Sequence, residues 1–254
     1  MVGARNDGAA RGAILTAATR LFAARGFDAT PLQAIADEVG VTKQAVLHHF
    51  PSKELLRKAV FDDILAHWNE TLPRLLLASS ASNERFDAVF AETLRFFTAD
   101  ASRARLVARE ALDRPKEMRE LLRGPVRPWI AAISGYIRAG QDAGRHYADV
   151  DPDVYVAEIM LFVITTVAVM PVVDAAVEGR GSRERMLSEL TRIARASLFA
   201  SGSPARAGAH DRGRSSISSG KSGREGTPWR ASSATTTTSG SGSKRASTGR
   251  RSSS

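Results

Sequence analysis

Three polar side chains near the N-terminus have the types and spacing needed to read nucleic-acid bases. Gln44 and His48 are four residues apart, so on a helix they share one face, and Lys43 stands beside Gln44. A glutamine amide can pair bidentately with adenine, and a lysine can bind guanine or a phosphate. Lys53, at the start of a later helix, is expected to meet a phosphate oxygen. The pattern predicts contact with double-stranded DNA.

A first short helix must come before these residues in order to position them. Thr30 is expected to N-cap it, with Pro31 at the first helical position and Gln33 completing a capping box. Gly40 is expected to end it, because a left-handed backbone is least costly at glycine. The face turned to the core would hold Ile35, Ala36 and Val39.

A second short helix is expected to carry the polar residues themselves. Thr42 is its predicted N-cap, and it should run to about His49. Its inward residues would be Ala45, Val46 and Phe50, and its outward residues Lys43, Gln44, Leu47 and His48. Two short helices joined by a glycine turn, the second with a polar outward face, are typical of a helix-turn-helix, whose second helix enters the major groove.

Flanking helices are expected to complete this unit. Residues 11–25 have one apolar stripe at helical spacing, whereas residues 1–10 are expected to form a frayed arm. Ser52 can cap a fourth helix that has no Gly or Pro before Pro73. We expect this helix to leave the DNA-binding unit and enter the second domain without a flexible linker, so that a tilt of the helix is transmitted between the two.

The stretch from Arg11 to about Leu56 resembles the DNA-binding domain of the TetR family of transcriptional regulators. The resemblance rests on the following matches in order and spacing: Thr30, Ile35-Ala36, Gly40-Val41-Thr42, His48-His49-Phe50 and Lys53-Glu54-Leu55. The family usually has Tyr where this chain has Leu47, and leucine cannot donate that tyrosine's hydrogen bond to a phosphate. The residues expected to contact DNA are Thr30, Thr42, Lys43, Gln44, Leu47, His48, His49 and Lys53.

The resemblance implies an all-α, homodimeric repressor that binds a palindromic operator and is released by a small-molecule effector. We expect a DNA-binding domain over residues 1–55 and a helical ligand-binding and dimerisation domain over 56–202. Apolar residues on more than one face of the helices expected from residue 153 to 177 and from 182 to 200 favour a homodimer. The residues proposed to line the implied pocket are Phe90, Phe97, Glu110, Trp129 and Tyr136.

The charge of +9 is concentrated at one end of the chain. Residues 203–254 hold ten of the 36 Lys and Arg residues and two of the 27 Asp and Glu residues, which leaves the rest of the chain nearly neutral. This segment is also rich in Ser, Thr and Gly, so we expect a disordered basic tail. The prediction of DNA binding therefore depends on the helix-turn-helix and not on bulk charge.

Other classes of function are disfavoured. The chain has no Cys, and the adjacent His48 and His49 point about 100° apart on a helix, so no metal site or other cofactor is expected. Glu110 and Asp113 lie among arginines, which indicates surface ion pairs more than a catalytic pair. Residues 159–173 are apolar but too short to span a membrane, so we expect a buried helix in a cytoplasmic protein. The alternative is an enzyme or interaction protein that uses the helix-turn-helix for protein contacts.

Overall fold

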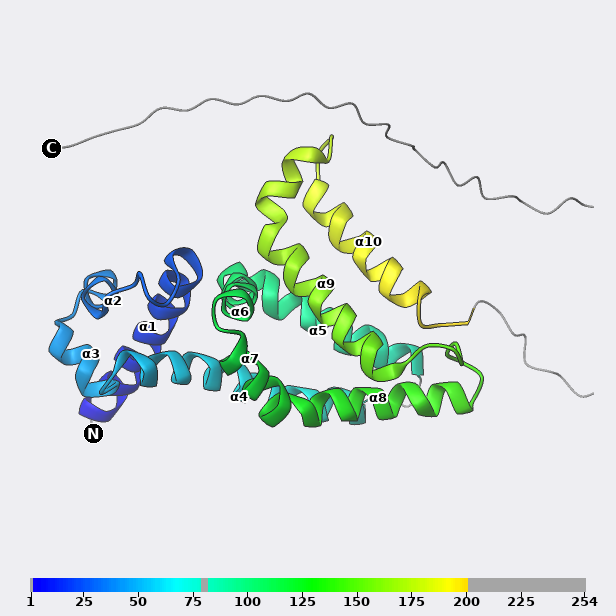
Figure 1. Ribbon diagram of the computed structural model, residues 1–254, viewed down its shortest axis with the longest axis horizontal. Coiled ribbons are helices and arrows are strands. Elements are labelled where there is room, and N and C mark those ends of the chain that lie inside the picture. Colours follow the sequence, from blue (N-terminus) through cyan, green and yellow to red (C-terminus); the bar gives the residue numbers. More distant parts are fainter. Residues whose placement is uncertain (1, 79–81, 201–254) are drawn as a thin grey trace, which may run out of the picture. The chain divides into compact units, whose positions relative to one another are not determined.

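The structure is a computed structural model that describes residues 2–78 and 82–200 (Figure 1). These residues form helices and one isolated antiparallel bridge, between His146 and Phe199, so the predicted all-α class is confirmed. The predicted tail, residues 203–254, lies outside the described residues. The α-helices are α1 (Val2–Arg25), α2 (Leu32–Val39), α3 (Lys43–His49), α4 (Lys53–Ala78), α5 (Ser82–Ala99), α6 (Ala101–Asp113), α7 (Pro115–Leu121), α8 (Arg127–Asp142), α9 (Pro152–Val173) and α10 (Ser182–Ala196).

Helix α1 begins at Val2, nine residues before its predicted start at Arg11. The prediction of a frayed arm over residues 1–10 was wrong for residues 2–10. This stretch contains no proline and three alanines, which favour helix. The extension brings Asp7 to the end of α3, where its Oδ1 lies 3.5 Å from Nδ1 of His49.

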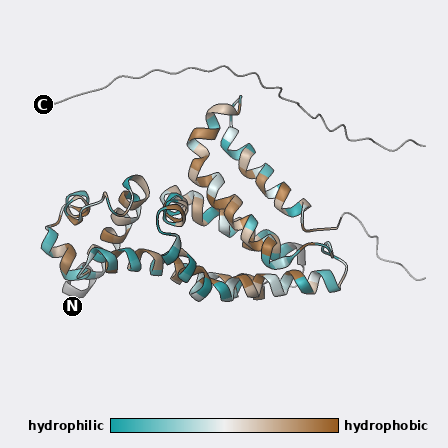
Figure 2. Ribbon diagram, in the orientation of Figure 1, coloured by the Kyte–Doolittle hydropathy of each residue, from teal (hydrophilic) through white to brown (hydrophobic). Residues whose placement is uncertain are grey.

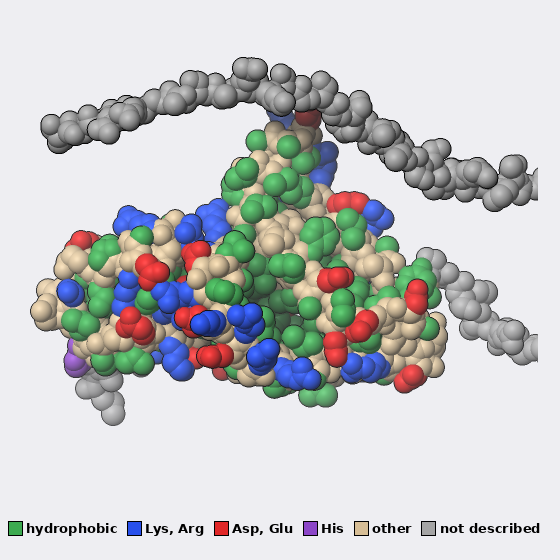
Figure 3. Space-filling model, in the orientation of Figure 1, with side chains coloured by type: hydrophobic (Ala, Val, Ile, Leu, Met, Phe, Trp, Pro, Cys, Tyr) green, Lys and Arg blue, Asp and Glu red, His purple; other side chains and the backbone are tan. Residues whose placement is uncertain are grey.

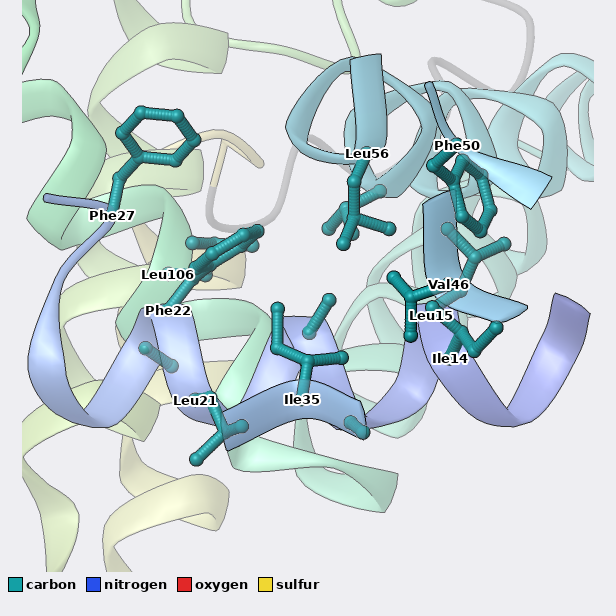
Figure 4. Close-up of a cluster of buried hydrophobic side chains, with 14 of the residues drawn as sticks. Ile14, Leu15, Leu21, Phe22, Phe27, Ile35, Val46, Phe50, Leu56 and Leu106 are labelled. Carbon is teal, nitrogen blue, oxygen red and sulfur yellow. The ribbon is translucent and has the colours of Figure 1, made fainter. Parts of the chain in front are cut away.

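One hydrophobic cluster holds α1, α2, α3 and the start of α4 together (Figure 4). Phe22, Ile35, Val46 and Leu56 come from these four helices in turn, and all are fully buried. Leu106 of α6 joins the same cluster, and α6 packs against α1, the helix that supports the helix-turn-helix. The division at residue 55 stays a prediction, and the cluster draws on residues well beyond it.

A second cluster joins the distal half of α4 to α5, α8, α9 and α10. Its members include Trp68, Phe90, Ile137, Val163 and Leu190. Helix α4 takes part in both clusters, because Leu56 lies in the first and Trp68 in the second. The predicted continuous fourth helix is therefore present, and it runs through Pro73 to Ala78.

Helix α9 is apolar along most of its length (Figure 2), and the prediction that it is buried is wrong for one of its faces. Its inner face is buried at Val156, Val163, Val167 and Met170. Its outer face exposes Val154, Leu161, Phe162, Val169, Val172 and Val173. The sequence run is apolar all round, so periodicity did not separate the covered face from the open one.

The segment Pro152–Ala176, which contains α9, is long and apolar enough to cross a membrane by length and composition, and 22% of its most apolar window is buried. The core helix of a soluble protein passes the same test, so this is weak evidence for a membrane span.

Candidate functional site

The predicted turn between α2 and α3 is present with its expected geometry. Gly40 has φ of 74°, in the left-handed region that favours glycine, and its backbone N–H donates to carbonyls of α2. Thr42 N-caps α3, because its Oγ1 accepts a hydrogen bond of 3.1 Å from the Ala45 N–H. The cap fixes where α3 begins and therefore which side chains stand on its first turn.

The polar residues of α3 are turned outward as the sequence predicted. Lys43, Gln44 and His48 are exposed, Leu47 is half-buried, and Val46 is fully buried. The side chains of Lys43, Gln44 and His48 form no hydrogen bond or ion pair with any other described residue. They are free to meet base edges.

Thr30 does not have either of its predicted roles. Its side chain is fully buried, and its Oγ1 donates 2.7 Å to the Gly26 carbonyl and 3.3 Å to that of Leu21. The cap position of α2 belongs to Pro31, which provides no side-chain hydrogen bond. Gln33 is also not part of a capping box, since its Nε2 donates to Asp37 at 2.7 Å. Thr30 ties the end of α1 to the next loop and cannot reach DNA.

Two other predicted DNA contacts already have partners within the chain. His49 is mostly buried, with its Nδ1 3.5 Å from Asp7. The Lys53 ammonium lies 4.5 Å from the centre of the Phe27 ring and donates 3.2 Å to the Asp28 carbonyl. An ammonium has three donors, so Lys53 keeps capacity for a phosphate oxygen.

A cavity of about 120 Å³ opens in the second cluster, between α4, α5, α8 and α9. Of the five residues predicted to line a pocket, Phe90, Trp129 and Tyr136 do so. The other lining residues are Trp68, Leu72, Leu76, Arg85, Phe86, Val89, Thr93, Val126, Ile130, Ile133, Ile137, Tyr155, Val156, Ile159, Met160 and Leu198.

Phe97 and Glu110 do not line this cavity, contrary to prediction. Phe97 is buried in the second cluster away from it. Glu110 was also expected to form surface ion pairs, but it is 2% exposed and accepts a 2.7 Å hydrogen bond from Arg57 Nε. Its partner lies 53 residues away in the sequence, so no local spacing pointed to it.

Most cavity residues were missed for a physical reason. Trp68, Leu72 and Leu76 of α4, and Phe86, Val89 and Phe90 of α5, have ordinary helical spacing. That signal finds the inner face of a helix but does not distinguish a packed core from a core with a void. The sequence does carry one signal for the cavity at Tyr155, because a tyrosine hydroxyl among apolar neighbours needs a buried hydrogen-bond acceptor. Its hydroxyl donates 2.5 Å to the Ala194 carbonyl, and burial raises its pKa.

Within the ranges 2–78 and 82–200, no three His, Asp or Glu side chains come together in a way that could hold a metal ion. His48 and His49 have ring centres 5.6 Å apart at a steep angle.

Comparison with known proteins identifies the family. Residues 14–60, which span the helix-turn-helix and its supporting helices, match the model of bacterial regulatory proteins of the tetR family. The HTH-type transcriptional regulator RutR of Escherichia coli strain K12 is 32% identical over 162 residues, covering 56% of this chain and 75% of RutR. The chain belongs to the TetR family. It is therefore a DNA-binding transcriptional regulator.

Solved structures share the fold of this TetR-family chain. FadR from Bacillus subtilis in complex with stearoyl-CoA aligns with a TM-score of 0.58 at 16% identity, covering 74% of this chain and 98% of FadR. A putative transcriptional regulator from Saccharomonospora viridis in complex with choline gives 0.58 at 22% identity, covering 76% and 100%. The relatives are transcriptional regulators and not enzymes, so the enzyme alternative is set aside.

Proposed function

We propose that this TetR-family regulator is a repressor that binds a palindromic operator as a homodimer and is released by a small molecule. The observation that carries the proposal is the continuity of α4. One helix places Leu56 in the core that supports α3 and Trp68, Leu72 and Leu76 in the wall of the cavity. A molecule in the cavity therefore touches the helix that holds the recognition unit.

The DNA contacts in this proposal divide into two kinds. Gln44, Lys43 and His48 read base edges from the exposed side of α3, with Thr42 and Leu47 beside them. His49 and Lys53 lie at the edge of the unit and meet phosphates. His49 must then exchange its contact with Asp7 for one with the DNA, because a carboxylate repels phosphate.

We propose that the exposed apolar face of α9 is the dimer interface, where a second copy of the chain covers it. Leu161 and Val172 are 61% and 76% exposed, and Phe162 and Val169 continue the same apolar surface. Figure 3 shows hydrophobic side chains gathered over this part of the molecule. Such a surface is costly in water, and a two-fold partner buries it against itself.

The effector is proposed to occupy the cavity. The complexes of two proteins of this fold with stearoyl-CoA and with choline support binding of small molecules by such a domain. A ligand that binds better to one tilt of α4 shifts the population toward that tilt. Two recognition helices must stay about 34–36 Å apart to enter successive major grooves, so a tilt releases the operator. The site of action is the cytoplasm, where the DNA lies.

The proposal is tested by selecting DNA bound by the purified chain from a random pool and then screening compounds for release of the selected site. We expect a palindromic site, bound by two chains, and at least one compound that lowers its affinity. The Gln44→Ala variant serves as the control for specific binding. Recovery of random sequences by the wild-type chain would contradict the proposal.

A further inference from the structure

The cavity walls define the chemistry of the molecule that fills them. Building on the proposed function, we infer that the effector presents one uncharged ring, or a short branched hydrocarbon of the same size, to this cavity. The inference rests on the polar atoms, the charges, the rings and the volume of the wall.

Three polar side chains of the wall already donate hydrogen bonds to acceptors in the protein. Thr93 Oγ1 donates 2.8 Å to the Val89 carbonyl, and the Tyr155 hydroxyl donates 2.5 Å to the Ala194 carbonyl. Trp129 Nε1 donates 2.9 Å to Asn69 Oδ1. A polar ligand group buried here loses its hydrogen bonds to water and gains none from these donors, which lowers its affinity.

The charges of the wall disfavour an ionic ligand. Among the described residues that line the cavity, Arg85 is charged and no carboxylate is present. The Arg85 side chain already interacts with another group of the protein, so it is not an unpaired charge available to an anion. Aromatic rings attract cations, but a cation here would lack a counter-charge and would face a guanidinium. An uncharged ligand meets neither penalty.

The aromatic side chains of the wall and the volume of the cavity indicate a ligand group with a single ring. Phe86, Phe90, Trp68, Trp129, Tyr136 and Tyr155 line the cavity. Phe86 and Phe90 lie nearly parallel, with centres 5.5 Å apart, and present a flat surface on which a further ring can pack. The cavity of about 120 Å³ is close to the roughly 150 Å³ of an apolar cavity that holds one benzene.

The test measures direct binding of three probes of nearly equal size in the absence of DNA. The probes are ethylbenzene, benzylammonium and phenylacetate, titrated into the full chain at neutral pH. Tryptophan fluorescence reports occupancy, because Trp68 and Trp129 both line the cavity, and Trp229→Phe removes the third tryptophan from every sample. We expect ethylbenzene to bind at least about tenfold tighter than either ion. Equal or tighter binding of an ion would overturn the inference.

Two variants connect the binding to this cavity. Val89→Phe fills the space and is expected to weaken ethylbenzene at least about tenfold, whereas Ile133→Ala enlarges it and is expected to favour naphthalene over ethylbenzene. Leu94→Ala is the matched control, since Leu94 lies on α5 with Val89 but outside the cavity wall. Thermal melts confirm that each variant folds.

Failure of this inference is distinguishable from failure of the proposed function. If polar compounds release the operator while ethylbenzene does not bind, the ligand class is wrong and the repressor proposal stands. If ethylbenzene binds with the expected selectivity but no compound releases DNA, the ligand class stands and the regulatory proposal is wrong.

Discussion

Arg57 of α4 and Glu110 of α6 form a buried ion pair between the helix that joins the two hydrophobic clusters and the helix that packs on α1. Arg57 Nε donates 2.7 Å to Glu110 Oε2, and Arg57 Nη2 donates to the same oxygen. The Arg57 guanidinium also lies 5.7 Å from the centre of the Phe27 ring, at the end of α1. The pair therefore fixes α4 where it leaves the DNA-binding unit.

Removing one partner of this pair is expected to destabilise the fold strongly. Glu110→Met leaves the Arg57 guanidinium half-buried without its carboxylate, and a loss of about 3 kcal/mol in the free energy of unfolding is expected. Urea unfolding at pH 7 measures it. The double variant Arg57→Met/Glu110→Met should recover much of the loss, because no charge is then left unpaired. Additive losses in the double variant would show that the two residues do not act as a pair.

Two glycines of α8 are expected to respond in opposite ways to alanine. A Cβ built on Gly140 would come within 2.0 Å of the His146 ring, whereas one on Gly135 would meet nothing within 4 Å. Gly140→Ala is expected to cost about 1–3 kcal/mol through overpacking. Gly135→Ala should instead gain up to about 1 kcal/mol of helix propensity. Thermal or urea unfolding compares them, and equal effects would contradict the close approach of Gly140 to His146.

His146 is expected to make the fold less stable in mild acid. Burial lowers the pKa of His146 below its ordinary value of 6.5, and its Nδ1 donates 3.0 Å to the Ile137 carbonyl. As pH falls below about 6.5, the unfolded chain takes up a proton that the folded chain resists, so the free energy of unfolding falls. His146→Gln should flatten the change between pH 7.5 and 5.5.

His48→Gln is the matched control, because His48 is exposed on α3. It should keep the wild-type loss of stability in acid. If His146→Gln kept the whole of that loss, another group would be its cause.

The outer face of α9 is expected to hold two copies of the chain together. Leu161→Glu or Val172→Glu places charge on this exposed face, so the variants should fold, sediment as monomers and lose operator binding. Leu77→Glu, on the equally exposed surface of α4, should remain dimeric. Leu190→Glu is unsuitable, since Leu190 is buried and the change would unfold the domain. A wild-type chain that sediments as a monomer at micromolar concentration would exclude the proposed dimer.

The features predicted most accurately from the sequence are those that depend on interactions between neighbouring residues. Gly40 and Thr42 set the turn and the cap of α3 through neighbouring backbone groups, so their roles followed from spacing. Thr30 has an equally good cap sequence, but packing against the end of α1 draws its hydroxyl inward. Glu110 and the cavity depend on residues from distant helices, which no periodicity within one helix could place.

A substitution at Leu47, in the middle of α3, distinguishes two modes of DNA binding. If this position only supports a phosphate contact, Leu47→Tyr should raise affinity equally for every operator variant. If the leucine instead packs on a thymine methyl group, the same change should alter the preference at one base pair. Binding to a panel of single-base operator variants measures which occurs. Either result retains α3 as the recognition helix, whereas no change in affinity or preference would place Leu47 away from the DNA.

The most direct test of recognition by α3 measures Gln44→Ala and Lys53→Ala on that same panel at two salt concentrations. Gln44→Ala is expected to lose about 1–3 kcal/mol at one base position and to relax the preference there. Lys53→Ala should weaken all variants alike and reduce the salt slope by about one unit. Equal losses for Gln44→Ala on every variant would contradict base reading by α3.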